Sequence, residues 1–198
     1  MRRIFRFKKR THPRNPALRA LLIGDGLIEL ATAMLAPIYA LFVAKVGGDL
    51  LDAGLTGGVF ALAAGITSLV GGRYADRTKN KRAMLSIGYV LNGVGFLLYL
   101  TAQSVIGLLI VQVFVGIVRQ YFTPVYDTLY SEHLDKGRAG VEWSHWEAMF
   151  YFATAIGAVV GGAIASAAGF NGVFIVMACL CFVSAAYLWT LPKRVFGS

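Results

Sequence analysis

Long apolar runs separated by short polar segments dominate the pattern of hydrophobic and polar positions along the chain. A helix rises about 1.5 Å per residue, so a run of about 20 residues crosses the roughly 30 Å hydrocarbon core of a bilayer. The six runs of that length cover residues 17–43, 53–75, 83–102, 104–130, 143–168 and 170–191. The pattern predicts an all-α membrane protein with six transmembrane helices, flanked by an N-terminal arm (1–16) and a short tail (192–198).

The composition agrees with this prediction, because 57% of the 198 residues are hydrophobic, 15% are charged and the mean hydropathy is +0.64. A water-soluble domain of this length needs more polar surface, so enzymes built on soluble folds are excluded and no enzymatic activity is predicted. The first apolar run is much longer than the core of a signal peptide, and no small-residue cleavage site follows it. We expect this run to stay in the mature protein.

Basic residues cluster in every second segment between the apolar runs. The formal net charge is +9, with eight of the 19 cations in residues 1–19 and five in residues 73–82. Cation-rich loops stay on the cytoplasmic side of a membrane. We therefore expect a multi-pass protein of the cell (inner) membrane, with both termini and the 73–82 and 131–142 loops in the cytoplasm. This placement indicates orientation in the bilayer and argues against nucleic acid as a partner.

Residues of the second apolar run recur 90 positions later, in the fifth run. Ile66, Val70, Gly71, Gly72 and Ala75 correspond to Ile156, Val160, Gly161, Gly162 and Ala165. Three helices separate the two copies, so they cross the membrane in opposite directions, and we expect two inverted three-helix repeats. The alternative is a chance recurrence of the small residues that pack most membrane helices.

The loop after the second run, residues 72–85, carries a glycine, a small residue before Asp-Arg, a basic pair and an apolar helix start. These features resemble the cytoplasmic signature of the major facilitator superfamily. The matching residues are Gly72, Ala75, Asp76, Arg77, Lys81, Arg82 and Leu85. Lys79 stands where the family has its central glycine. An ordinary positive-inside loop is the alternative, but it explains the cations without explaining Asp76.

Two further runs resemble the family. The fourth run has Gly116 followed by Pro124, with Gln112 where the family commonly has an arginine. The fifth run has a glycine motif over residues 157–162, with Ala158 in place of the proline typical of antiporters. The resemblance implies a major-facilitator half fold and transport by alternating access. The cytoplasmic gating motif that it implies consists of Gly72, Asp76, Arg77, Lys81 and Arg82.

Members of this family ordinarily have twelve helices, and their two six-helix halves face each other across the substrate cavity with the same direction through the membrane. Two copies of this chain can do the same, so we expect a parallel homodimer with the transport path on its two-fold axis. The resemblance implies that Asp76 then docks on the partner's fifth helix near residues 143–145, closing the cytoplasmic side. The alternative is that the sequence is part of a longer chain.

Ionised side chains lie inside the predicted spans. Asp25 and Glu29 are one helical turn apart on one face, and Glu29 lies about 18 Å from the start of its helix. Arg119 lies at a similar depth, about 16 Å from the inner end of the fourth helix. Intramembrane charges are costly and mark functional sites, so we expect Glu29, assisted by Asp25, to couple transport to protons, with Arg119 as counter-ion or substrate contact. A static Glu29–Arg119 pair and a solvated Asp25 near the inner mouth are the alternatives.

Polar and aromatic side chains beside these charges are candidates for the substrate cavity. They are Thr32, Tyr39, Gln112, Gln120, Tyr121, Thr123 and Tyr126. Such groups receive an amphipathic or cationic organic solute through stacking, cation–π contact and charge. Tyrosines near helix ends, such as Tyr126 and Tyr130, also serve as simple interfacial anchors.

The remaining chemistry-bearing residues indicate no cofactor, metal or catalytic site. Cys179 and Cys181 lack the partners of a zinc site, and we expect them to act as packing residues. Ser144 and His145 point about 100° apart in a helix, without an oxyanion-hole motif. We therefore predict a proton-coupled secondary transporter of a small organic solute, and we expect it to act in the efflux of a drug or metabolite. The alternative is a non-transporting structural or regulatory subunit that pairs with another half-transporter.

Overall fold

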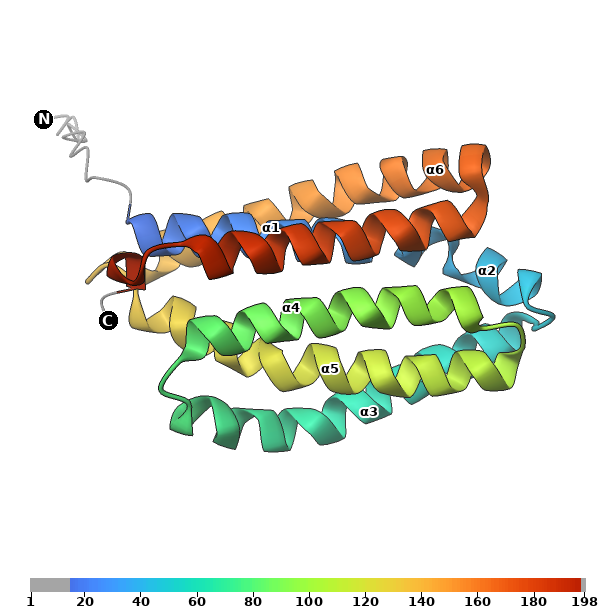
Figure 1. Ribbon diagram of the computed structural model, residues 1–198, viewed down its shortest axis with the longest axis horizontal. Helices are drawn as coiled ribbons and strands as arrows, with labels where there is room; N and C mark the ends of the chain where they lie inside the picture. Colours follow the sequence, from blue (N-terminus) through green and yellow to red (C-terminus); the bar gives the residue numbers. More distant parts are fainter. Residues whose placement is uncertain (1–14, 197–198) are drawn as a thin grey trace, which may run out of the picture.

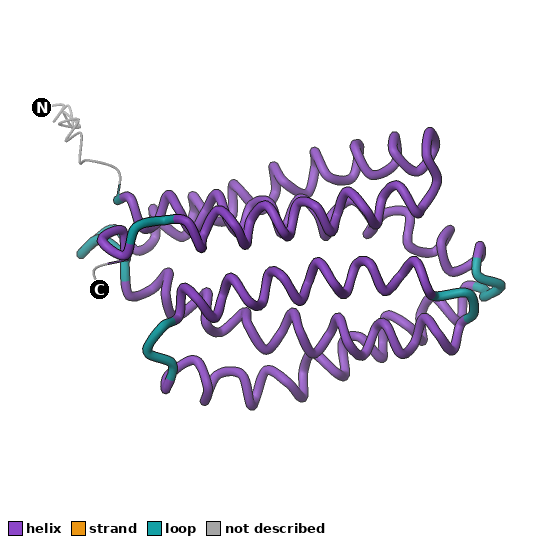
Figure 2. Tube along the Cα trace, in the orientation of Figure 1, coloured by secondary structure: helices purple, strands orange, loops and turns teal. Residues whose placement is uncertain are grey.

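The computed structural model describes residues 15–196, and every regular element in this part of the chain is helical (Figure 1, Figure 2). The α-helices are α1 (Pro16–Leu35), α2 (Tyr39–Lys45), α3 (Leu50–Arg77), α4 (Lys81–Leu98), α5 (Val105–Glu132) and α6 (Ala139–Thr190). Short 3-10 turns cover Ala36–Ile38, Tyr99–Thr101 and Lys193–Phe196. The predicted all-α fold is confirmed, and most of the predicted N-terminal arm lies outside the described residues.

Helix α6 is 52 residues long and makes two membrane passes. Gly169, with φ 71° and ψ −179°, interrupts the helix, a conformation that glycine adopts readily. Figure 1 shows that the chain reverses there, so the first arm of α6 (139–168) and its second arm (170–190) are antiparallel. The other apolar segments long enough to cross a membrane are Pro16–Lys45, Leu50–Arg77, Lys81–Thr101 and Val105–Glu132. Together they give six passes, as the hydrophobic runs predict.

The first pass is not the continuous helix predicted over residues 17–43. α1 ends at Leu35, and the turn Ala36–Ile38 leads into α2. Pro37 explains the break, because proline lacks a backbone N–H and its ring clashes with the carbonyl of the preceding turn. The two helical pieces still form one segment long enough to span the membrane.

Polar caps place the helix starts ahead of the apolar runs. The Asn15 carboxamide oxygen accepts from the backbone N–H of Ala17 at 3.1 Å. Asp49 and Asp52 form a capping box in which each side chain accepts from the other's backbone N–H. Caps of this kind satisfy the free N–H groups of the first turn, so α3 begins at Leu50 rather than at residue 53.

The helices pack in pairs that follow the inverted repeat. α1 packs against α6, α3 packs against α5, and α1 and α5 run in opposite directions (Figure 1). Gly26 of α1 lies against the Met149 side chain, and Gly116 of α5 lies against the Phe60 backbone. A shift of 90 residues maps Gly26 onto Gly116 and brings Met149 within one residue of Phe60. These equivalent contacts confirm the two inverted three-helix repeats.

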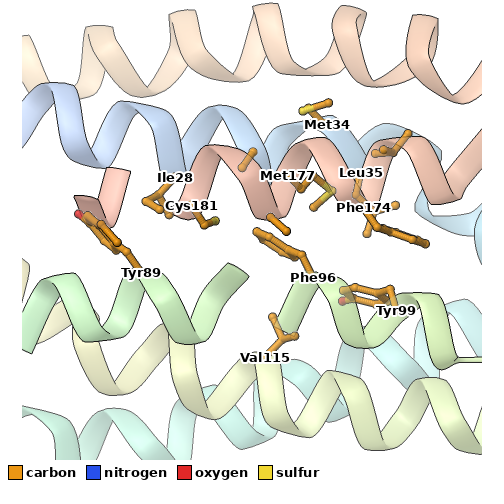
Figure 3. Packing of buried hydrophobic residues seen from close by; sticks show 14 of the residues in the cluster. Ile28, Met34, Leu35, Tyr89, Phe96, Tyr99, Val115, Phe174, Met177 and Cys181 are labelled. Atoms are coloured by element: carbon orange, nitrogen blue, oxygen red, sulfur yellow. The ribbon is translucent and has the colours of Figure 1, made fainter. Parts of the chain in front are cut away.

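The apolar core lies between α1, α4 and the second arm of α6 (Figure 3). Ile28 of α1, Phe96 of α4 and Met177 of α6 are among its buried members. Cys181 is fully buried in this core, in line with its predicted packing role, whereas Cys179 is exposed. This packing holds α1 and α4, which carry part of the candidate site, against the second arm of α6.

Candidate functional site

Glu29 and Arg119, predicted to lie at similar depth, form an ion pair across α1 and α5. One guanidinium nitrogen of Arg119 (Nη2) donates to both carboxylate oxygens of Glu29, at 2.8 and 3.1 Å. Its other terminal nitrogen donates to Thr32 Oγ1 at 2.8 Å. The Glu29 side chain is 12% exposed and that of Arg119 is 27% exposed. The pair is therefore largely shielded, and its geometry is that of a strong charge-assisted contact.

Asp25 has different surroundings, one turn away on the same helix. Trp146 Nε1 donates to its carboxylate at 2.9 Å, and the Tyr89 hydroxyl lies within hydrogen-bond distance at 3.4 Å. Asp25 is 8% exposed, so it does not occupy the solvated position that the sequence left open. Among residues 15–196 it forms no ion pair, which makes it a buried carboxylate held by neutral donors.

These groups line a cavity of about 230 Å³ between α1, α4, α5 and the first arm of α6, here called the acidic cavity. Its predicted members are Asp25, Glu29, Arg119, Gln120, Thr123 and Tyr126. Sequence reasoning missed Tyr89, Asn92, Trp146 and Phe150, which form the walls from α4 and α6. The acidic cavity thus joins the three predicted charged residues with three of the seven predicted cavity residues, and it has two walls that were not predicted.

A second cavity, of about 270 Å³, contains the remaining polar candidates from α1, α2 and α5. Thr32, Tyr39 and Gln112 line it. Arg119 and Asn92 line both cavities, so these two side chains stand at the boundary between them.

Gln112, which occupies the position of the family's arginine, belongs to a neutral hydrogen-bond chain. The Tyr99 hydroxyl donates to its side-chain oxygen at 3.0 Å, and its amide nitrogen donates to the Tyr39 hydroxyl. The Tyr39 hydroxyl in turn donates to Thr56 Oγ1 at 2.7 Å. This chain links α5 to α2, α3 and the turn after α4, with no charged group in it.

Two of the predicted residues of α5, Tyr121 and Gln120, contact α3. Tyr121 lines neither cavity, and its ring lies 5.3 Å, centroid to centroid, from that of Tyr74. Gln120 lines the acidic cavity, and its amide donates to Ser68 Oγ at 3.3 Å.

Tyr126 is 4% exposed, and its hydroxyl has no hydrogen-bond partner within the described part of the chain. Tyr126 is therefore a buried residue of the cavity wall rather than an interfacial anchor.

The signature loop begins inside the last turns of α3. Gly72 is half-buried, whereas Asp76 and Arg77 are exposed. Neither of these two charged side chains forms an ion pair with another residue of the 15–196 segment.

The basic pair of the loop ties neighbouring helix ends together. Lys81 Nζ lies 2.9 Å from Glu132 Oε1 at the end of α5. The guanidinium of Arg82 donates to the backbone carbonyl of Leu191, just beyond α6. The start of α4 is therefore fixed to the ends of two other passes on the same side of the bundle.

Comparison with known proteins agrees with this geometry. The family model described as Major Facilitator Superfamily matches residues 21–197. The multidrug resistance protein MdtG of Erwinia billingiae is 28% identical over 189 residues, which cover 92% of this chain and 46% of that relative. The MFS-type transporter MJ1560 of Methanocaldococcus jannaschii is 30% identical over 140 residues, covering 71% of this chain and 36% of the relative.

A solved structure shows the same fold. The POT family transporter PepTSo superposes with a TM-score of 0.73 at 16% sequence identity, over 91% of this chain and 38% of that one. The chain thus spans about half the length, or less, of the relatives that it matches. The protein is a multi-pass membrane protein, and the chain belongs to the major facilitator superfamily.

Proposed function

We propose that the chain works as a proton-coupled secondary transporter that exports small organic solutes by alternating access. The acidic cavity carries this proposal, because Asp25 and the Glu29–Arg119 pair lie together in it among aromatic side chains. Ionisable residues inside a membrane are costly and mark proton and substrate pathways. Relatives named for multidrug resistance support an organic solute as the cargo.

Proton coupling rests on the Glu29–Arg119 contact. A helix movement that separates the two residues leaves both charges unbalanced in a medium of low dielectric, which is strongly unfavourable. A proton on Glu29 or a solute beside Arg119 then restores neutrality. Asp25, one turn away on the same helix, assists as a second proton acceptor. Movement between inward-open and outward-open states is thereby linked to proton transfer.

Two parallel copies of the bundle enclose the pathway in this proposal. A lone bundle leaves the ionised side of its cavity facing hydrocarbon, at a cost of several kcal/mol. α3 is the least buried of the apolar segments, and Leu62 and Leu69 are exposed along it. The first arm of α6 exposes Tyr151 and Phe152. These two apolar faces are suited to pair α3 of one copy with the first arm of α6 of the other.

The exposed signature aspartate fits this pairing. Asp76 lies in the last turn of α3, and the first arm of α6 begins at Ala139, on the side of the bundle where both described ends of the chain lie (Figure 1). In a parallel dimer Asp76 docks near the partner's residues 143–145 and closes that side. By the distribution of cations this is the cytoplasmic side of the inner membrane.

Reconstitution of the purified full chain in liposomes tests the proposal. We expect an imposed pH gradient to drive accumulation of radiolabelled organic solutes, and Glu29→Gln to reduce it at least tenfold. Asp135→Asn removes a carboxylate from the loop between α5 and α6, outside the acidic cavity and the helix faces proposed to pair, and serves as the matched control, with unchanged accumulation expected. Absence of gradient-driven flux for every solute, or full flux in a folded Glu29→Gln variant, contradicts the proposal and favours the non-transporting subunit.

A further inference from the structure

The acidic cavity carries more negative than positive charge. Asp25, Glu29 and Asp127 contribute three carboxylates, against the single guanidinium of Arg119 among its lining residues. Arg119 is engaged by Glu29, and Asp127 is exposed. The ionisable lining residues are Asp25, Glu29, Tyr89, Arg119, Tyr126 and Asp127. A cation that enters the cavity therefore meets two carboxylates without an ion pair in the described part of the chain, Asp127 and Asp25, whereas an anion is repelled.

The walls of the cavity suit an organic cation rather than a metal ion. Aromatic rings supply them from three helices: Tyr89, Phe122, Tyr126, Trp146 and Phe150. The rings of Trp146 and Phe150 are stacked, with centroids 5.8 Å apart and planes at 15°. Aromatic faces attract ammonium groups through cation–π contact, most strongly when water is excluded. A metal ion instead requires several oxygen or nitrogen ligands that converge on one point.

The Tyr126 hydroxyl is a buried polar atom without a hydrogen-bond partner in the described part of the chain. A buried polar atom without a hydrogen bond costs about 1–3 kcal/mol, so such atoms are rare unless a ligand or water completes them. Tyr126 is 4% exposed and belongs to the wall of the acidic cavity, and its hydroxyl is buried. A ligand that fills the cavity completes it.

We propose that Asp25 is the binding residue for an organic ammonium cation, held between Trp146 and the other aromatic walls, while Glu29 and Arg119 remain paired. The cavity of about 230 Å³ is smaller than the roughly 300–1,000 Å³ of drug-sized pockets, so it accepts an ammonium head with one small ring. This inference rests on the proposed function and gives its solute a chemical class. A carboxylate that holds the cation and a proton in turn is what an exchanger needs.

Calorimetric titration of the purified full chain in detergent tests this site without any transport step. The probe is phenyltrimethylammonium, and benzenesulfonate is the anion of similar size. We expect the cation to bind and the anion not to bind. Asp25→Asn keeps an acceptor for Trp146 Nε1 and is expected to weaken binding of the cation at least tenfold. The Asp135→Asn control is expected to bind the cation as the unmodified chain does.

The tryptophan provides a second pair of variants, which keeps the test decisive if Asp25→Asn fails to fold. Trp146→Phe keeps an aromatic face and is expected to bind within about threefold of the unmodified chain, whereas Trp146→Ala loses about tenfold. Cation binding that is unchanged in both Asp25→Asn and Trp146→Ala, or equal binding of benzenesulfonate, overturns the inference.

The two proposals fail in different ways. If the cation binds through Asp25 but no solute moves in liposomes, the proposed transport function fails and the binding site stands. If liposomes accumulate benzenesulfonate as well as the cation, and Asp25→Asn leaves that accumulation unchanged, transport stands and the ammonium site is overturned.

Discussion

The buried charged residues are of two kinds: Glu29 and Arg119 form an ion pair, whereas Asp25 is held by neutral donors. Counting depth along two helices was sufficient to predict that Glu29 and Arg119 lie at the same level, and they form a pair. The partner of Asp25 was not predictable in that way, because Trp146 is 121 residues away and reaches it only through the packing of α6 against α1. Asn92, a lone amide in an apolar run, was a signal in the sequence for the α4 wall.

Removing the guanidinium of the ion pair isolates a buried carboxylate. Arg119→Ala is expected to lower the free energy of unfolding by about 3 kcal/mol, because Glu29 then has no compensating charge. The measurement is an SDS titration of the purified protein followed by circular dichroism. Arg73→Ala removes an exposed cation of α3 without an ion pair in the described segment, and no measurable change is expected.

A double variant separates lost charge balance from lost packing. Glu29→Gln combined with Arg119→Gln removes both charges together, and we expect it to recover more than half of the stability lost in Arg119→Ala. If Arg119→Ala is as stable as the unmodified chain, or if the double variant is the less stable of the two, the pair does not hold α1 to α5 electrostatically.

The hydrophobic pattern predicts the number of membrane passes correctly, but it predicts the helix ends only approximately. Apolar run lengths predicted six passes because the bilayer thickness sets a minimum for each run. The ends differ because hydropathy does not detect caps such as Asp49, which starts α3 three residues earlier than predicted, at Leu50. Hydropathy also does not predict the break at Pro37, which interrupts the first pass within an apolar run.

Adjacent glycines of α6 offer a matched test of helix packing. A side chain at Gly161 meets the backbone of Met34 on α1, whereas one at Gly162 meets nothing within 4 Å. Gly161→Val is therefore expected to lower the free energy of unfolding by about 2 kcal/mol or more, with little change for Gly162→Val. The same SDS titration measures both, and equal stability of the two variants contradicts close contact between α1 and the first arm of α6.

The complete bundle presents apolar faces whose partners the sequence alone does not reveal. Lipid-facing and protein-facing helix surfaces in a membrane are similarly apolar, so the 90-residue repeat predicts the internal fold but not what covers Leu69 or Tyr151. The proposed contact with a second bundle uses the exposed position of Asp76, near the end of α3.

Cysteine crosslinking tests the proposed parallel arrangement. In a background with Cys179→Ala and Cys181→Ala, copies carrying Arg73→Cys are expected to form disulfides with differently tagged copies carrying Ser144→Cys. Both positions lie near the same end of the bundle in a parallel pair (Figure 1). Leu100→Cys, after the opposite end of α4, serves as the control and is expected not to react with Ser144→Cys. A preference for the Leu100 partner indicates an antiparallel pair.

The mass of the full chain released from lipid vesicles, measured by native mass spectrometry, is the most direct test of a pathway shared between two bundles. We expect the main species to have twice the 21.4 kDa mass of one chain, with the dimer surviving at low protein-to-lipid ratio. A main species at 21.4 kDa across all protein-to-lipid ratios contradicts a pathway built from two identical bundles.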